Sequence, residues 1–503
     1  MFEAAQQTTA QRSPVSLHEL LQLPYPAYLP QGARLLATPE RLCANPRYAG
    51  RGITLAFLDS GFYPHPDLTR PRERIARYID ATEGTPAERQ FVKTPQIENW
   101  HGTMTSCVGA GNGFMSDGLY RGLSDEARVV LIKTGSPRTR RIHDRDIIRA
   151  MDWVIANHAR ERIRVVNISL GGERAPAGTL TELDQLVEEA SRMGIVVVAA
   201  AGNGGVQGVH SPAHAPAAIA VGGLDDQNTL ERSHWRLYPS DYGQGADGGP
   251  KPEVIAPARW LAAPMLVTTD THQEGMFLWQ LMQQTDRQFA AALEEPLAKG
   301  YFKQRTRRLP IAEIRTLIRG RMVEQKFIHA HYQHVDGTSF AAPIVASLAA
   351  QMLEANPALT PAQVKTILMA TAEPVPGEPR ERQGRGAISA PHAVAAALRT
   401  PQAPLAGLPF SPGITGWAVT FVYHDDEAHE VCLVGSFNQW QPYEHPMHAI
   451  RPGVWQVTIQ PPAPGKHPYK FLIDQSHWTR DPENPAVVED GYGDYHSLLH
   501  IPL

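Results

Sequence analysis

The sequence predicts a large α/β domain with a central parallel sheet, followed by a small antiparallel β-sandwich. Two observations lead to this expectation. Up to about residue 400, short apolar runs rich in β-branched residues alternate with helical patterns, which is typical of strands buried on both faces of a parallel sheet. Beyond that point, apolar and polar residues alternate, which is typical of strands with one buried face. A chain of 503 residues has room for both parts.

The strands expected in the first part are continuous apolar runs. They are ITLAFLD (53–59), RVVLIK (128–133), RVVNISLGG (164–172) and GIVVVAAAGN (194–203). Between the last two runs, residues 180–193 place apolar side chains at helical spacing. Such strand–helix–strand units predict a parallel sheet.

The second part follows a stiff linker. Residues 401–413 contain four prolines and almost no charge, a composition that favours an extended chain. The runs 418–423 and 454–459 then alternate with a period of two and are separated by turn residues. We therefore expect one domain over 49–400 and a sandwich over 414–503.

A helical insertion interrupts the first domain at about 265–334. It contains helical stretches at 276–295 and 310–328, with the basic run KQRTRR at 303–308 between them. Two roles stay open for the insertion: a lid that restricts substrates, or a peripheral helical hairpin. The basic run is either the solvated end of a surface helix or a docking site for an acidic partner.

Composition argues against several classes of partner. Lys and Arg number 47 and Asp and Glu 51, a net charge of −4, so no basic field exists to hold nucleic acid or an acidic membrane. No apolar run approaches the roughly 18 residues that span a bilayer, and the first residues do not resemble a signal peptide. Three separated cysteines suit free thiols in a reducing compartment. We therefore expect a cytoplasmic protein.

Four residues at strand ends and helix starts could together perform chemistry. Asp59 and Asn203 end two of the buried runs, while His101 precedes a glycine at the start of one helical pattern and Ser339 lies at the start of another, two residues after a glycine. Each alone has an ordinary explanation as a turn, loop or capping residue. Together they supply a hydroxyl nucleophile, its base, an acid that orients the base and a donor for an oxyanion, which is the set that peptide hydrolysis needs.

These motifs resemble those of the subtilisin-like serine proteases, the subtilases. The resemblance spans about 50–395 and rests on LAFLDSGFYPHPDL, HGTMTSCVGAG, VVNISLGG, GIVVVAAAGNGG, SPAHAPAAIAVGGLD, GTSFAAPIVASLAA, LTPAQVKTILMATA and GRGAIS. It implies a three-layer fold and a serine endopeptidase that acts through an acyl-enzyme. It further implies that Ser339 is the nucleophile and His101 the general base. Asp59 would orient the imidazole, and Asn203 would bind the oxyanion.

The resemblance also assigns a substrate-binding edge and shows departures from the family pattern. Ser169, Leu170 and Gly171 would pair with a substrate strand through backbone hydrogen bonds. Met104 stands where the family usually has a second histidine, and Cys107 replaces a usual glycine. Cys107 either makes activity thiol-sensitive or is a small buried thiol. The chemistry needs no cofactor or metal; calcium stabilises many members, but no ligand spacing here identifies a site.

Residues 1–48 form a Pro-rich extension with one short helical stretch at 16–23. Its segment LQLPYPAYLP (21–30) resembles the short inhibitory extension of intracellular subtilisins. The extension therefore either blocks the active site or is a passive N-terminal arm.

The stretch VCLVGSFNQWQPYEHPMHAIRPGVWQVTIQPPAPGKHPYKFLIDQSHWTRDPENP resembles the glycogen-binding module of the AMP-activated kinase β subunit and of branching enzymes. The resemblance covers about 417–503 and implies an immunoglobulin-like sandwich. Trp440, Lys470 and Trp478 fall on the sugar-contacting positions, where exposed aromatic rings stack on sugar rings, whereas His496 replaces a usual asparagine. The module either binds an α-glucan or serves as a structural or protein-docking domain.

The sequence as a whole predicts a cytoplasmic serine endopeptidase that acts on proteins or peptides. Its C-terminal module would tether or regulate it. The alternative is a non-catalytic scaffold that uses the same fold on glycogen. A scaffold has no need to keep all four chemical groups, so the enzyme is the preferred interpretation.

Overall fold

The computed structural model describes residues 35–503 with short gaps at 83, 92–93, 137, 140, 174–177, 401–410, 416–417, 426, 452, 483, 485, 490–494 and 502–503. The chain forms two compact units that divide between Gln402 and Ala403. The helical stretch expected at 16–23 and most of the linker expected at 401–413 lie outside the described residues. Among the residues described, no helix is both long and apolar enough to cross a membrane.

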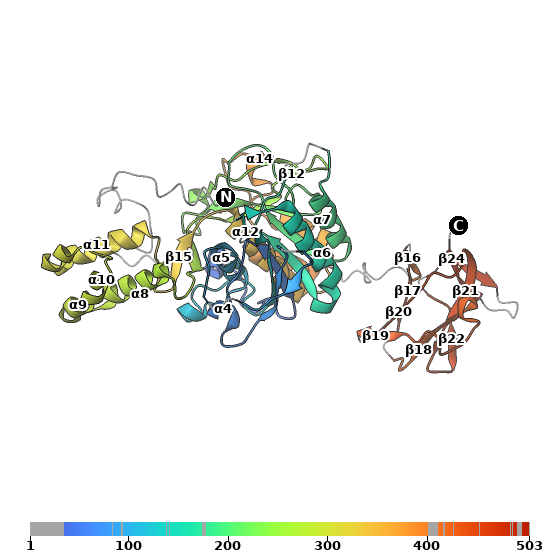
Figure 1. Cartoon of the computed structure of the whole chain (residues 1–503). Helices are drawn as coiled ribbons and strands as arrows, with labels where there is room; N and C mark the ends of the chain where they lie inside the picture. Colours follow the sequence, from blue (N-terminus) through green and yellow to red (C-terminus); the bar gives the residue numbers. More distant parts are fainter. Residues whose placement is uncertain are drawn as a thin grey trace. The chain divides into compact units, whose positions relative to one another are not determined.

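Within the described residues, nine strands form the central sheet of the first unit, in the order β10-β9-β8-β7-β1-β4-β2-β3 with β13 paired to β9. Figure 1 shows the whole chain, coloured from the N-terminus to the C-terminus. The bounds are β1 Thr54–Asp59, β2 Ile75–Asp80, β3 Ala87–Glu88, β4 Arg128–Lys133, β7 Ile163–Ile168, β8 Val196–Ala200, β9 Ile219–Asp225, β10 Arg236–Leu237 and β13 Val254–Pro257. The predicted parallel pairing of the apolar strands is confirmed, while β3 and β10 pair antiparallel to their neighbours. The sheet is therefore mixed, with a parallel centre.

Helices cover both faces of this sheet, which confirms the three layers. Side chains that alternate along β1 enter two separate cores: Phe57 packs on one face and Leu58 on the other. The helices on the first face are α5 Asn99–Ala110, α12 Thr338–Ala355, α13 Pro361–Thr371 and α15 Ala390–Arg399. Those on the second are α6 Asp144–Glu161 and α7 Glu182–Arg192. Nearly every residue of α12 is buried, as its apolar sequence requires.

The remaining short elements of the first unit lie in its connections. They are α3 Thr38–Arg41, α4 Pro66–Thr69, α14 Arg380–Gln383, the 3₁₀ turns η3 Phe114–Ser116 and η4 Arg232–His234, and the strands β5 Gly135–Ser136, β6 Arg141–Ile142, β11 Gly243–Gln244 and β12 Pro250–Lys251. Cys43 is exposed and Cys107 is buried, and both are free thiols, as is Cys432 of the second unit.

The insertion has a two-stranded stem and a helical body with its own apolar core. The stem pairs β14 Leu261–Pro264 with β15 Tyr332–Val335. The body contains α8 Asp270–Gln283, α9 Asp286–Ala292, α10 Glu294–Ala298, η5 Gln304–Arg308 and α11 Ile311–Glu324. Helix α8 starts earlier than the sequence pattern suggests and ends before 295. The helix predicted over 276–295 is interrupted between α8 and α9 because Gln284 and Thr285 are extended. The Arg315 guanidinium binds the Met282 and Gln284 carbonyls at this point.

The described strands of the second unit form two antiparallel sheets around an apolar core, which confirms the predicted sandwich. One sheet has the order β16-β17-β20-β19, with bounds Gly413–Thr415, Ala418–His424, Val454–Ile459 and His448–Arg451. The other contains β18 Val431–Gly435, β21 Gly465–Ile473, β22 His477–Thr479, β23 Val487–Glu489 and β24 Tyr495–Ile501; η6 Ser436–Asn438 follows β18.

Candidate active site

Asp59 and His101, predicted to work together, form a direct hydrogen bond. Asp59 ends β1 and is fully buried, and its Oδ1 lies 2.7 Å from Nδ1 of His101 near the start of α5. A carboxylate only accepts hydrogen bonds, so Nδ1 carries the imidazole proton and Nε2 is left with a free lone pair. Helix α5 approaches β1 this closely because Gly102 follows His101: a Cβ there would lie 2.3 Å from the Gly61 carbonyl oxygen.

Two further donors hold the Asp59 carboxylate, and the sequence pattern did not single them out. The Thr105 hydroxyl donates to Oδ2 at 2.9 Å, and the Ser60 N–H donates to Oδ1 at 2.7 Å. Thr105 follows His101 by four residues, so both side chains lie on the same face of α5. That spacing is the signal that could have identified it.

The electrostatics of the pair favour a protonated imidazole. Burial of the His101 ring opposes its charged form, but the charge and the hydrogen bond of Asp59 outweigh this effect and raise the pKa of His101 above its ordinary value. The ring can therefore accept a proton more readily than a free imidazole.

Ser339 is the second residue of α12, and the residue that follows it contacts the His101 ring. The ring of Phe340, its neighbour in the chain, lies 5.6 Å from the His101 ring, centroid to centroid. The Ser339 hydroxyl donates to the Ser169 carbonyl at 3.3 Å, and within the described residues it forms no hydrogen bond to His101. The Ser339 hydroxyl must therefore exchange its bond to Ser169 for one to His101 before the imidazole can take its proton.

Asn203, just beyond β8, reaches the turn that precedes Ser339. Its Oδ1 accepts hydrogen bonds from the Thr338 N–H at 2.8 Å and from the Thr338 hydroxyl at 3.0 Å. These bonds fix the orientation of the amide, and Nδ2 remains available as a donor. Thr338, which the sequence motifs did not indicate, therefore orients the predicted oxyanion donor.

The predicted substrate edge continues from β7 to the site. Ser169 is buried, and its hydroxyl donates to the Ser339 carbonyl at 2.7 Å, which ties this edge to the start of α12. Leu170 is also buried and Gly171 is exposed. The three residues thus lead from the nucleophile towards solvent.

A mostly apolar hollow of about 550 Å³ lies beside His101. The residues that line it are Ser60, Pro95, Gln96, Ile97, Trp100, His101, Met104, Ile142, Leu170, Met265, Leu266, Thr269, Thr271 and Gln333. Met265, Leu266, Thr269 and Thr271 belong to the base of the insertion. The insertion consequently forms part of the wall next to the predicted base.

One buried group in the described part of the chain has the composition of a metal site. Ligand atoms of His65, Asp67 and Cys107 lie within 4.8 Å of one another. Calcium takes six to eight oxygen ligands, whereas this group offers nitrogen, sulfur and one carboxylate already bonded to the Tyr332 hydroxyl and the Met115 N–H. The group does not fit calcium. Burial raises the pKa of the Cys107 thiol well above its usual value, which disfavours the thiolate.

In the second unit, the predicted sugar-contacting residues share the outer face of one sheet. Lys470 on β21 pairs with Val434, and Trp478 on β22 pairs with Leu472. Directly opposed residues of antiparallel strands point to the same face. Trp440 follows η6 and packs on Val434 and Leu472, so it covers that face too.

The three residues differ in accessibility. Trp478 is 43% exposed, Trp440 is half-buried and Lys470 is buried with 7% exposed. The ring of His496, which departs from the family pattern, lies 4.7 Å from the Trp440 ring between centroids. His496 therefore contributes to the same face.

Comparison with known proteins identifies a family for each of the two units. The model of the subtilase family matches residues 50–387, and the model of the glycogen recognition site of AMP-activated protein kinase matches residues 417–502. "Serine protease AprX" of Bacillus subtilis (strain 168) is 31% identical over 358 residues, which cover 69% of this chain and 66% of AprX. "Subtilisin BL" of Lederbergia lenta is 31% identical over 215 residues, which cover 42% of this chain and 66% of that protein.

The chain thus spans slightly less than two thirds of the length of these relatives. A solved structure of proteases from Pseudoalteromonas arctica PAMC 21717 aligns with 74% of this chain and 97% of its own, at 19% identity and a TM-score of 0.46. Because the subtilase model matches more than half of the chain, the protein belongs to the subtilase family of serine proteases.

Proposed function

We propose that this chain is a serine endopeptidase that hydrolyses proteins or peptides, with Ser339 as its nucleophile. The observation that carries the proposal is the 2.7 Å hydrogen bond between the buried Asp59 carboxylate and His101, whose ring contacts Phe340 at the start of α12. The bond holds the imidazole in the tautomer whose Nε2 can accept a proton. Ser339 stands at a helix N-terminus, where the aligned peptide dipoles favour a developing negative charge.

The reaction uses these groups in two steps. His101 Nε2 takes the hydroxyl proton while Ser339 Oγ forms a bond to the substrate carbonyl carbon, and the same imidazole then gives that proton to the departing amine. The product of this step is an ester between Ser339 and the acyl part of the substrate. A water molecule, deprotonated by His101, then releases the acid and restores the hydroxyl. Asp59 stabilises the imidazolium in both steps.

Asn203 Nδ2 and the Ser339 N–H bind the oxyanion of each tetrahedral intermediate. The support is the orientation of the amide: both hydrogen bonds from Thr338 engage Oδ1, so Nδ2 is left as the available donor. The backbone of Ser169, Leu170 and Gly171 pairs with the extended substrate. The hollow beside His101 accepts an apolar substrate side chain, since aliphatic and aromatic groups dominate its wall.

The C-terminal module binds an α-glucan through the face that carries Trp440, Lys470 and Trp478. Family similarity over 417–502 and the shared face of the three residues support this assignment. An exposed indole beside a partly covered one provides flat apolar surface on which sugar rings can stack. Through this face the module tethers the protease to glycogen.

Replacing the nucleophile tests the central proposal. Ser339→Ala should abolish covalent labelling by a fluorophosphonate probe and reduce peptide hydrolysis by at least 10³-fold, because no hydroxyl remains to attack. Ser347→Ala removes a hydroxyl from the same helix away from the site and should keep both activities. Labelling that persists in Ser339→Ala would refute the assignment, and a wild-type chain that is neither labelled nor active would favour the scaffold.

The raised pKa of His101 predicts the pH dependence. Since only the neutral imidazole acts as a base, kcat/KM should rise with pH through an apparent pKa above the ordinary value of about 6.5. In a Ser339→Ala background, Asp59→Asn removes the charge that raises this pKa, so the His101 proton NMR signal should titrate at lower pH. His101→Ala identifies that signal. An unchanged titration would show that Asp59 does not control the imidazole.

The oxyanion role of Asn203 predicts a specific kinetic signature. Asn203→Ala should lower kcat by about 10²–10³-fold, the loss seen on removing such a donor from subtilisin, and change KM by less than about threefold. Thr338→Val leaves the Asn203 amide in place, held by the backbone N–H of residue 338, and should lower kcat by less than about tenfold. A loss confined to KM would instead indicate that Asn203 binds substrate.

The glucan assignment predicts retarded migration in gels that contain glycogen. Trp440→Ala and Trp478→Ala should each weaken retardation several-fold, because each removes a stacking surface. Ile450→Ala alters an exposed apolar residue on the other sheet and should leave retardation unchanged. Equal mobility of the wild type with and without glycogen would refute the assignment.

A further inference from the structure

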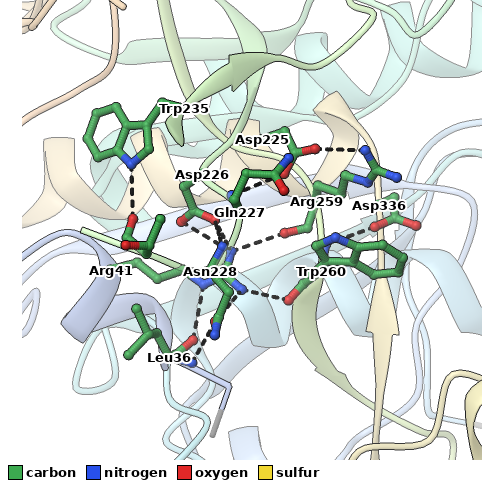
Figure 2. Close-up of polar contacts among 11 residues, drawn as sticks. Leu36, Arg41, Asp225, Asp226, Gln227, Asn228, Trp235, Arg259, Trp260 and Asp336 are labelled. Atoms are coloured by element: carbon green, nitrogen blue, oxygen red, sulfur yellow. Dashed lines mark hydrogen bonds and ion pairs between the residues drawn. The ribbon is translucent and has the colours of Figure 1, made fainter. Parts of the chain in front are cut away.

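A buried arginine near the described N-terminal end contacts the segment that leads to the insertion. The Arg41 side chain has no exposed surface, although it lies only six residues after the first described residue. Each of its five N–H groups has an acceptor, as Figure 2 shows. The acceptors are the Leu36 carbonyl at 3.1 Å, Asp226 Oδ1 at 3.0 Å, the Arg259 carbonyl at 3.0 Å, the Trp260 carbonyl at 2.8 Å and Asn228 Oδ1 at 3.3 Å.

The charge of Arg41 is balanced within this cluster. Asp226 is itself buried, with 3% of its surface exposed, and is the acidic partner of the guanidinium. Removing the guanidinium would leave the buried Asp226 carboxylate without its counter-charge, and the Arg259 and Trp260 carbonyls without this donor, which would destabilise the folded state. Arg41 therefore fixes the positions of residues 259 and 260 strongly.

Residues 258–260 in turn hold the residues just before the nucleophile. Trp260 has a positive φ of 56°, and its backbone N–H donates to Asp336 Oδ1 at 2.8 Å (Figure 2). The Gly337 N–H donates to the Ala258 carbonyl at 2.8 Å. Gly337 has a φ of 131°, which a residue with a side chain rarely adopts, so the turn depends on these external contacts as well as on its glycine. Ser339 follows two residues later.

The same contacts extend to the oxyanion donor. Thr338, directly after Gly337, holds Oδ1 of Asn203 with its N–H and its hydroxyl. A shift of the 336–338 turn would move the Ser339 backbone and release the orientation of the Asn203 amide together. Displacements of about 1 Å in such groups can cost on the order of 100-fold in rate.

We propose that Arg41 is a positioning residue of the active site, which acts through the carbonyls of Arg259 and Trp260 on the turn that presents Ser339 and orients Asn203. The inference deepens the proposed protease function and rests on it. A segment more than 200 residues away in sequence from Trp260 and Ser339 thereby sets the geometry of the nucleophile.

The test compares Arg41 with an arginine of the same chemistry in another place. Arg164, at the start of β7, also binds three main-chain carbonyls, those of Gly194, Pro357 and Leu359. Arg41→Gln, Arg41→Lys and Arg164→Gln are made in the full chain. For each we measure the Tm, kcat and KM on a peptide substrate, and amide hydrogen exchange over residues 334–340.

Arg41→Gln should lower kcat at least tenfold with KM changed less than about threefold, and should accelerate exchange at 334–340. Arg41→Lys, which keeps the charge but has three donors, should give a smaller change in the same direction. Arg164→Gln should lower the Tm while leaving kcat and exchange at 334–340 within about twofold of the wild type. In the Asn203→Ala background, Arg41→Gln should reduce kcat by a smaller factor than in the wild type, because part of its effect acts through Asn203.

A lower Tm with unchanged kcat and unchanged exchange at 334–340 would show that Arg41 only stabilises the fold, and would overturn the inference. If Arg41→Gln does not fold, Arg41→Lys decides by the same criteria. Failure of the wild type to hydrolyse peptides would refute the proposed function, whereas the exchange comparison would still test whether Arg41 controls the turn.

Discussion

The buried carboxylate of Asp59 is the constraint on which the site depends. A charged group without water is tolerated only when protein donors replace its hydration, and here an imidazole N–H, a hydroxyl and a backbone N–H do so. Two of these donors, His101 and Thr105, come from one helix. The need to satisfy Asp59 therefore fixes both the approach of α5 to β1 and the tautomer of the imidazole.

The order of the sheet explains how distant residues reach this carboxylate. Strands β8, β7 and β1 are neighbours and run parallel, so their carboxyl ends lie along one edge. Asn203, Ser169 and Asp59 each follow or end one of these strands. Helix α12 packs on the same sheet and brings Ser339 to that edge. The site is thus a consequence of three adjacent strand ends and one buried helix start.

Local patterns predict most of this arrangement, because burial on both faces and strand-end placement leave a clear mark in sequence. They identify the apolar strands and place Asp59 and Asn203 at their ends. They do not predict that Arg41 pairs with Asp226, since nothing local to either residue signals a partner 185 positions away. Nor do they predict the end of α8 before 295: the sequence there continues a helical pattern, and the break depends on the tertiary contacts of Arg315.

The contacts around Trp260 also hold together the two ends of the insertion. Strand β14 begins directly after Trp260, and strand β15 ends directly before Asp336. The backbone N–H of Trp260 donates to the Asp336 side chain. The two ends of the insertion are therefore joined by a hydrogen bond at the base of its stem. The entropic cost of closing a loop depends mainly on bringing its ends together and only weakly on its length. Once Trp260 and Asp336 are bonded, a helical body can therefore be inserted just before the nucleophile at little further cost in loop entropy. Arg41, which lies outside the insertion, binds the Trp260 carbonyl, and Lys326, which follows α11 within the insertion, binds Asp336, so each end of the insertion has a further contact.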